Sequence, residues 1–214
     1  QAKLYGFELH PSCPRKDPDT LKQILHQAYH RNVRFVIFFP DLGLEFPKLD
    51  VDRSRFEMIA LSNSWETYGV HVVAPNHYAN TLRACDHLLE KGVKRLGVVS
   101  MRQVEEKAAY KFSSAATSFN YQHLPADAHI PPLILETDTF ATAFPRWLKE
   151  QDPDMILFAG NYPLHLRMDL LKLSDGRPIQ TLYDSFPSHP PLMDMRLEAV
   201  GRDAVNLVKQ LMII

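Results

Sequence analysis

Polar and aromatic residues that follow the ends of predicted strands are the clearest chemical signal in this sequence. Side-chain amides and carboxylates form paired hydrogen bonds with neighbouring hydroxyl groups, and flat rings stack on the apolar face of a sugar. The candidates for binding a small hydroxylated ligand are Asn161, Asp184, Trp65, Asn76, Tyr162, Tyr183, Lys111 and Asn63. Asn and Asp also favour helix caps and turns. The spacing alone therefore leaves two interpretations open: a binding site, or a set of caps and turn residues.

Signals for catalysis and for metal binding are weak. The sequence contains no GxSxG, HExxH or GxxxxGK[ST] motif, and no GxGxxG follows a predicted strand. His26 and His30 stand one helical turn apart, a spacing that could hold zinc. A structural zinc needs four ligands, however, and the sequence offers no convincing companions. We therefore predict a protein that is not an enzyme and that requires no metal or cofactor.

Composition indicates a globular protein of ordinary character. The chain has 214 residues, 45% of them hydrophobic, with a formal net charge of −1. It is long enough to bury a core, and its charge is not that of a protein built mainly to hold phosphates. No apolar run reaches membrane-spanning length, the N-terminal stretch lacks a signal-peptide core, and two cysteines do not suggest a disulfide scaffold. We expect a cytoplasmic protein with no membrane partner.

Predicted strands and helices alternate along the chain. The expected helices lie at 18–30, 77–91, 103–121, 137–151 and 198–212, and the expected strands at 33–40, 58–62, 71–74, 96–100, 132–136, 154–160 and 179–184. This alternation predicts an α/β fold with parallel sheets, in which ligands bind beyond the carboxyl ends of the strands. Two sheets fit better than one. We predict an N-terminal subdomain over 1–94, completed by 195–214, and a C-terminal subdomain over 95–194.

Three stretches carry a resemblance to a known family. They are "VHVVAPNHYANTLRACDHLLEKGVKRLGVVS" (70–100), "DPDMILFAGNYPLHLRMDLL" (152–171) and "IQTLYDSFPSHPPLMDMRLEAVGRDAVNLVKQL" (179–211). Each resembles, in order and in spacing, a segment of the LacI/GalR transcriptional regulators: the strand, polar turn and helix before "GHRRI", the "PDAIFAAND" segment, and the "GFDD…PPLTTV" segment. No one stretch is decisive, but the three together are fairly specific.

The resemblance implies two Rossmann-like subdomains with parallel sheets, periplasmic-binding-protein-like type I, and an effector in the cleft between them. It also implies a homodimer and operator DNA held by a separate domain. The family's helix-turn-helix, hinge helix and first sheet strand have no counterpart here. Asn161 and Asp184 keep the family's amide and first acid, whereas Tyr162 and Ser185 replace acids, so we expect a different effector from that of the well-known sugar repressors. A solute-binding protein of a transport system is the alternative.

Overall fold

The computed structural model describes residues 2–12, 18–39, 52–63, 69–136, 138–159, 176, 181–183 and 196–213. The chain divides into two compact units. One comprises Gln1–Pro75 with Arg196–Ile214, and the other comprises Asn76–Met195. The sequence predicted the boundary between the two subdomains near residue 95. In the structure the boundary between the two units lies after Pro75, so the helix that follows Asn76 belongs to the second unit. That helix packs against another helix of the second unit, a contact that sequence order does not reveal.

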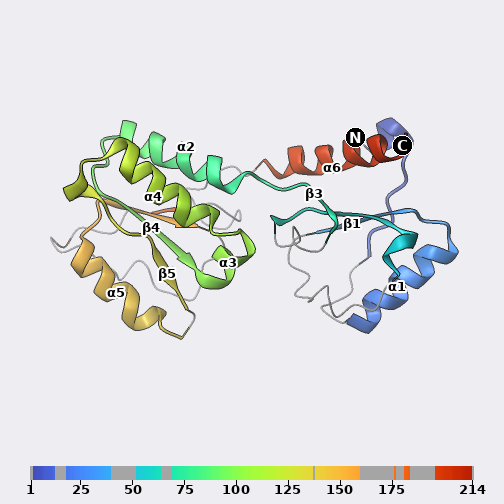
Figure 1. Ribbon diagram of the computed structural model, residues 1–214, viewed down its shortest axis with the longest axis horizontal. Coiled ribbons are helices and arrows are strands. Elements are labelled where there is room, and N and C mark those ends of the chain that lie inside the picture. Colours follow the sequence, from blue (N-terminus) through green and yellow to red (C-terminus); the bar gives the residue numbers. More distant parts are fainter. Residues whose placement is uncertain are drawn as a thin grey trace. The chain divides into compact units, whose positions relative to one another are not determined.

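The first unit is a three-layer α/β/α arrangement. Its parallel sheet has the order β1-β2-β3 and lies between α1 and α6 (Figure 1). Alternate residues of β2 face the two helices. Met58 and Ala60 pack with helix α1, while Ile59 and Leu61 pack with helix α6. The elements are η1 (Lys3–Tyr5), α1 (Pro18–His30), β1 (Phe35–Phe38), η3 (Arg53–Arg55), β2 (Glu57–Ala60), β3 (His71–Val72) and α6 (Leu197–Leu211).

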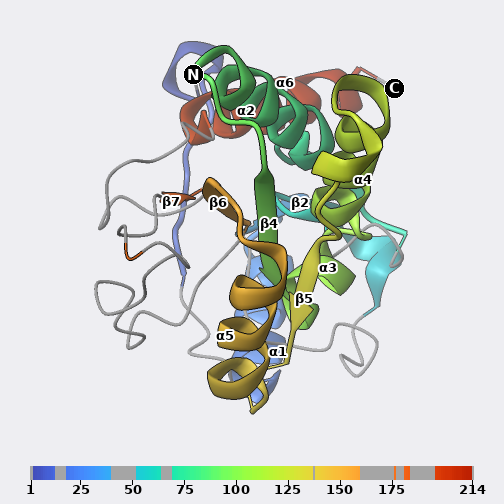
Figure 2. The same ribbon diagram turned by 90° about the vertical axis from the view of Figure 1, so that its left-hand side faces the viewer.

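The second unit repeats this layering around a parallel sheet of order β5-β4-β6-β7. Helix α5 covers one face, where it packs against Val99, and helices α2 and α4 cover the other, where they pack against Val98 (Figures 1 and 2). The elements are α2 (His77–Glu90), β4 (Leu96–Met101), α3 (Arg102–Lys107), α4 (Lys111–His123), η5 (Ala126–Ala128), β5 (Leu133–Leu135), α5 (Phe140–Gln151), β6 (Met155–Ala159) and β7 (Thr181–Tyr183).

The predicted fold class is confirmed. Strands and helices alternate, both sheets are parallel, and the two sheets divide before and after residue 95 as expected. The described residues 2–12 contain the short helix η1 and no strand. Among the helices that the structure describes, none has the length and apolar character needed to cross a membrane.

The predicted helix over 103–121 is wrong in one respect, because the structure divides it into α3 and α4. Ala109 and Tyr110 between them have φ angles of 51° and 57°, in the left-handed region that L-residues rarely occupy. The break is held by the backbone N–H of Tyr110, which donates to the carbonyl oxygen of Glu105 at 2.7 Å. A chain reversal of this kind turns the start of α4 toward the end of β4.

Candidate functional site

Four of the eight predicted ligand-binding residues lie outside the part of the chain that the structure describes. The backbone of Tyr183 ends β7, but its side chain is among those not described. Three candidates can be placed: Asn63, Asn76 and Lys111. The candidates that fall outside are Trp65, Asn161, Tyr162 and Asp184.

The two asparagines belong to different units and have different contacts. Asn76 is exposed, and its Oδ1 accepts a hydrogen bond of 3.0 Å from the backbone N–H of Ala79, which makes it the N-cap of α2. Asn63 follows β2, and its Nδ2 donates to the carbonyl oxygen of Pro75 at 3.4 Å. Asn76 is therefore a helix cap, one of the two interpretations that the sequence left open. The cap uses the oxygen of the amide and none of its N–H groups.

Lys111 stands at the carboxyl edge of the second sheet, where it begins α4. His77 begins α2, and its ring lies 4.7 Å from the ring of Phe112, centroid to centroid. Burial and, after it, the charge of Lys111 lower the pKa of His77 to about 4. His77 is therefore a neutral imidazole at physiological pH. Its buried Nδ1 has no hydrogen-bond partner among the described residues.

An ion pair joins the carboxyl ends of two neighbouring strands. Arg102 follows β4 directly, Glu136 follows β5 directly, and these strands pair in parallel. The Nε of Arg102 donates to Oε1 of Glu136, and both side chains are a little under half exposed. Neither residue was among the predicted site residues. Their position immediately after two strands was the available signal, but the pairing of those strands is not evident from the sequence.

A buried carboxylate connects two elements at this edge of the sheet. Glu105 is fully buried, and its Oε1 accepts hydrogen bonds from the Ser100 hydroxyl at 2.7 Å and from the Ser113 backbone N–H at 2.9 Å. Burial raises the pKa of Glu105, although both hydrogen bonds act in the opposite direction. Because Ser100 lies on β4 and Ser113 in the first turn of α4, the carboxylate ties the strand end to the helix start. Glu105 therefore positions the residues at the rim.

The described part of this edge has the chemistry of binding. It presents a guanidinium, an ammonium, a carboxylate, an amide and a neutral imidazole, all of which can form hydrogen bonds with a polar ligand. In the described ranges, no group of three or more His, Cys, Asp and Glu side chains is arranged to hold a metal ion. Arg102 and Glu136 offer a donor and an acceptor side by side, an arrangement that suits a hydroxyl group.

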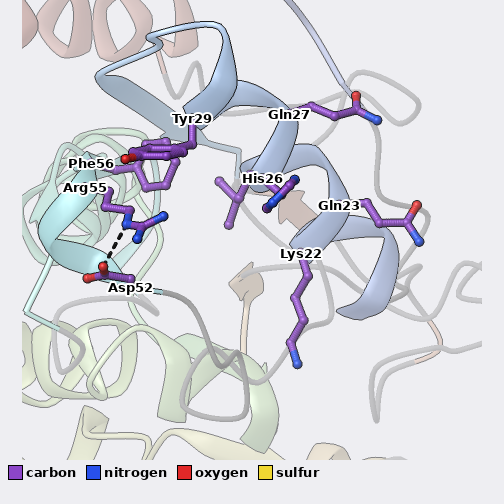
Figure 3. A pocket seen from close by; sticks show the side chains of 9 residues that line it. Lys22, Gln23, His26, Gln27, Tyr29, Asp52, Arg55 and Phe56 are labelled. Carbon is purple, nitrogen blue, oxygen red and sulfur yellow. Dashed lines mark hydrogen bonds and ion pairs between the residues drawn. The ribbon is translucent and has the colours of Figure 1, made fainter.

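A hollow of about 490 Å³ lies elsewhere, on the first unit (Figure 3). It is formed by α1 and η3, which precede β1 and β2, so it is not at the carboxyl ends of those strands. Arg55 crosses its wall: the guanidinium lies 4.3 Å from the centroid of the Tyr29 ring, and its Nε contacts Oδ2 of Asp52 at 2.8 Å. No feature of the sequence predicted this hollow.

Comparison with known proteins links the chain to a fold. No protein-family model matches it, and no curated protein matches its sequence. The transcription regulator CcpA of Lactococcus lactis is similar in structure, with 13% identity and a TM-score of 0.63 over 99% of this chain and 82% of that one. A periplasmic binding protein/LacI transcriptional regulator of Alkaliphilus metalliredigens, complexed with D-xylulofuranose, gives 14% identity and a TM-score of 0.61 over 98% and 81%.

The Cra transcriptional dual regulator of Pseudomonas putida, in complex with fructose 1-phosphate, gives 14% identity and a TM-score of 0.54 over 96% of this chain and 80% of that one. At such identities the similarity establishes the fold alone. The chain has the periplasmic-binding-protein-like fold that these regulators share.

Proposed function

We propose that this chain is the ligand-sensing and dimerisation domain of a LacI/GalR-type transcriptional regulator that acts in the cytoplasm. The observation that carries the proposal is its structural similarity, over 96–98% of its length, to regulators whose structures contain D-xylulofuranose or fructose 1-phosphate. The three sequence stretches that resemble the family add independent support. In this proposal a homodimer binds operator DNA through a separate domain, and the chain performs no catalysis.

The effector in this proposal is small and hydroxylated. It is held by residues that follow the carboxyl ends of parallel strands, which is where ligands bind in open α/β sheets. Asn161 and Asp184 are the principal contacts, with Trp65, Tyr162 and Tyr183 as stacking partners. Lys111, Asn76 and Asn63 supply further polar contacts. A ligand regulates DNA binding only if it has different affinities for two conformations of the protein, so effector and operator affinities must be coupled.

The first experiment is a thermal-shift screen over sugars, sugar phosphates, sugar acids, nucleosides and amino acids. A true effector at a hundredfold excess over its Kd stabilises the folded protein by about 3 kcal/mol. Losing one buried hydrogen bond costs about 1–3 kcal/mol, so Asp184→Ala and Asn161→Ala should each weaken binding of the hit about tenfold or more. Asp86→Ala, at an exposed position of α2, is the matched control. Parent-like binding by both site variants would refute the assigned contacts.

A solute-binding protein of a transport system is the second candidate. One structural neighbour is described both as a periplasmic binding protein and as a LacI regulator, so the fold serves both descriptions. The complete coding sequence separates them: a helix-turn-helix segment supports the regulator, and a secretory leader supports the transport protein. A gel-shift with the complete gene product and its own upstream DNA should then show sequence-selective binding that the hit from the screen alters.

A further inference from the structure

Two histidines meet on the exposed surface of α1. His26 and His30 lie one turn apart on the same face of the helix, and both are exposed. Their Nε2 atoms are 3.3 Å apart, and their ring centroids are 4.4 Å apart. An N–H···N hydrogen bond prefers a separation nearer about 3.0 Å. The observed separation of the two Nε2 atoms is therefore longer than that of an ideal hydrogen bond between them.

That distance matches the separation of two ligands on one metal ion. Imidazole nitrogens bind zinc at about 2.0–2.1 Å, so two of them at a tetrahedral angle lie about 3.3–3.4 Å apart. Nickel and copper also bind imidazole but prefer square-planar or octahedral geometry, in which neighbouring nitrogens lie about 3.0 Å apart, so the two rings would turn slightly toward each other. The two side chains are exposed, so small rotations can adjust the bite without disturbing the core. The two imidazoles therefore stand close to the separation that a shared transition-metal ion requires.

The position of the pair on its helix favours a cation. His30 is the last residue of α1, so the imidazoles stand over the final turn, where the helix carries its partial negative charge. His26 also forms part of the wall of the hollow in Figure 3. Arg55, which also lines that wall, forms an ion pair with Asp52 at 2.8 Å. The charge of Arg55 is thus partly balanced before an ion arrives.

We propose that His26 and His30 form a surface binding site for one late divalent transition-metal ion, of the nickel, copper and zinc class. The two Nε2 atoms are the protein ligands, and water completes the coordination. This is not the four-ligand structural zinc site that the sequence already argued against, and folding does not depend on it. The proposal is independent of the effector function, because it concerns one helix of the first unit.

The test is calorimetric titration of the parent chain with Ni²⁺, beside the variants His26→Gln and His30→Gln. The parent should bind one Ni²⁺ per chain, and either substitution should weaken that binding at least tenfold, because a single imidazole cannot chelate. His87→Gln is the matched control, since His87 is an exposed histidine in the last turn of α2 without a histidine one turn away. It should bind Ni²⁺ like the parent.

A second readout does not rely on heat of binding. Saturating Ni²⁺ should raise the unfolding temperature of the parent and of His87→Gln, because the ion binds the folded helix and not the unfolded chain in this geometry. The shift should be lost in both α1 variants. The proposal is overturned if the parent fails to bind Ni²⁺ in the micromolar range, or if His26→Gln and His30→Gln bind it as the parent does.

Discussion

Gly97 packs against the indole ring of Trp147, so adding one methyl group at Gly97 tests the packing of the second unit directly. Gly97 is the second residue of β4, and a Cβ atom built on it would stand 2.5 Å from Cη2 and 3.2 Å from Cζ2 of Trp147. The Cβ of Pro153 would be 3.4 Å away. The first of these separations is shorter than real Cβ contacts allow. The ring or the strand must therefore move in Gly97→Ala.

The ring has little freedom to move. Trp147 is 7% exposed, packs in the core beside Phe144, and its Nε1 donates to the carbonyl oxygen of Pro131 at 3.3 Å. Overpacking of a core typically costs about 1–3 kcal/mol. Replacing glycine by alanine within a strand returns about 0.5–1 kcal/mol through the unfolded chain. We expect Gly97→Ala to lower the free energy of unfolding by about 1–2 kcal/mol.

A double-mutant cycle measured by urea unfolding, with far-ultraviolet circular dichroism as the signal, tests this cause. Trp147→Leu removes both clashing atoms. In that background the added methyl group enters the space the indole left, so Gly97→Ala should be neutral or stabilising. The coupling between the two sites should reach about 1 kcal/mol or more. Equal destabilisation in both backgrounds, or a neutral single variant, would refute the reasoning.

Two further predictions concern the carboxyl edge of the second sheet. Since the pKa of His77 is about 4 in the folded chain and 6.5 ordinarily, the unfolded chain binds more protons between these values. Stability should therefore fall as the pH falls from about 6.5 to 4, by about 2–3 kcal/mol, and His77→Leu should flatten this slope in pH-dependent urea unfolding. At the α3–α4 break, Ala109→Gly should raise the free energy of unfolding by about 0.5–1 kcal/mol, because the φ angle of 51° at Ala109 suits glycine. The control Ala141→Gly, at an exposed position in the first turn of α5, should not raise it, because the φ angle there is helical.

The sequence predicts the layers of this fold well because buried apolar residues recur at regular intervals along its helices and strands. The apolar run at 33–40 contains β1, and the capping residue Asn76 marks the start of α2. The break between α3 and α4 has no such mark. It lies at Ala109 and Tyr110, neither of which is a usual left-handed residue, and it depends on Glu105 meeting Ser113 eight residues later. Contacts of that kind are decided by tertiary packing.

The candidate site, like the fold, could be predicted from the sequence only in part. Sequence order shows which residues follow a strand, and Lys111, which begins α4 in the structure, was proposed as a site residue on that ground. It does not show which strands are neighbours. Arg102 and Glu136 are 34 residues apart and meet only because β5 pairs with β4. A polar residue directly after each of two strands becomes a candidate pair only once the order of the sheet is known.

The buried Glu105 connects the fold of the second unit to its binding edge. Its carboxylate costs free energy to bury, and its Oε2 has no partner among the described residues. The same carboxylate caps α4 through Ser113 and holds the Ser100 hydroxyl at the end of β4. An apolar residue could fill the space, but it could not join those two elements. The position of Lys111 at the rim, two residues before Ser113, therefore follows from a polar contact inside the unit.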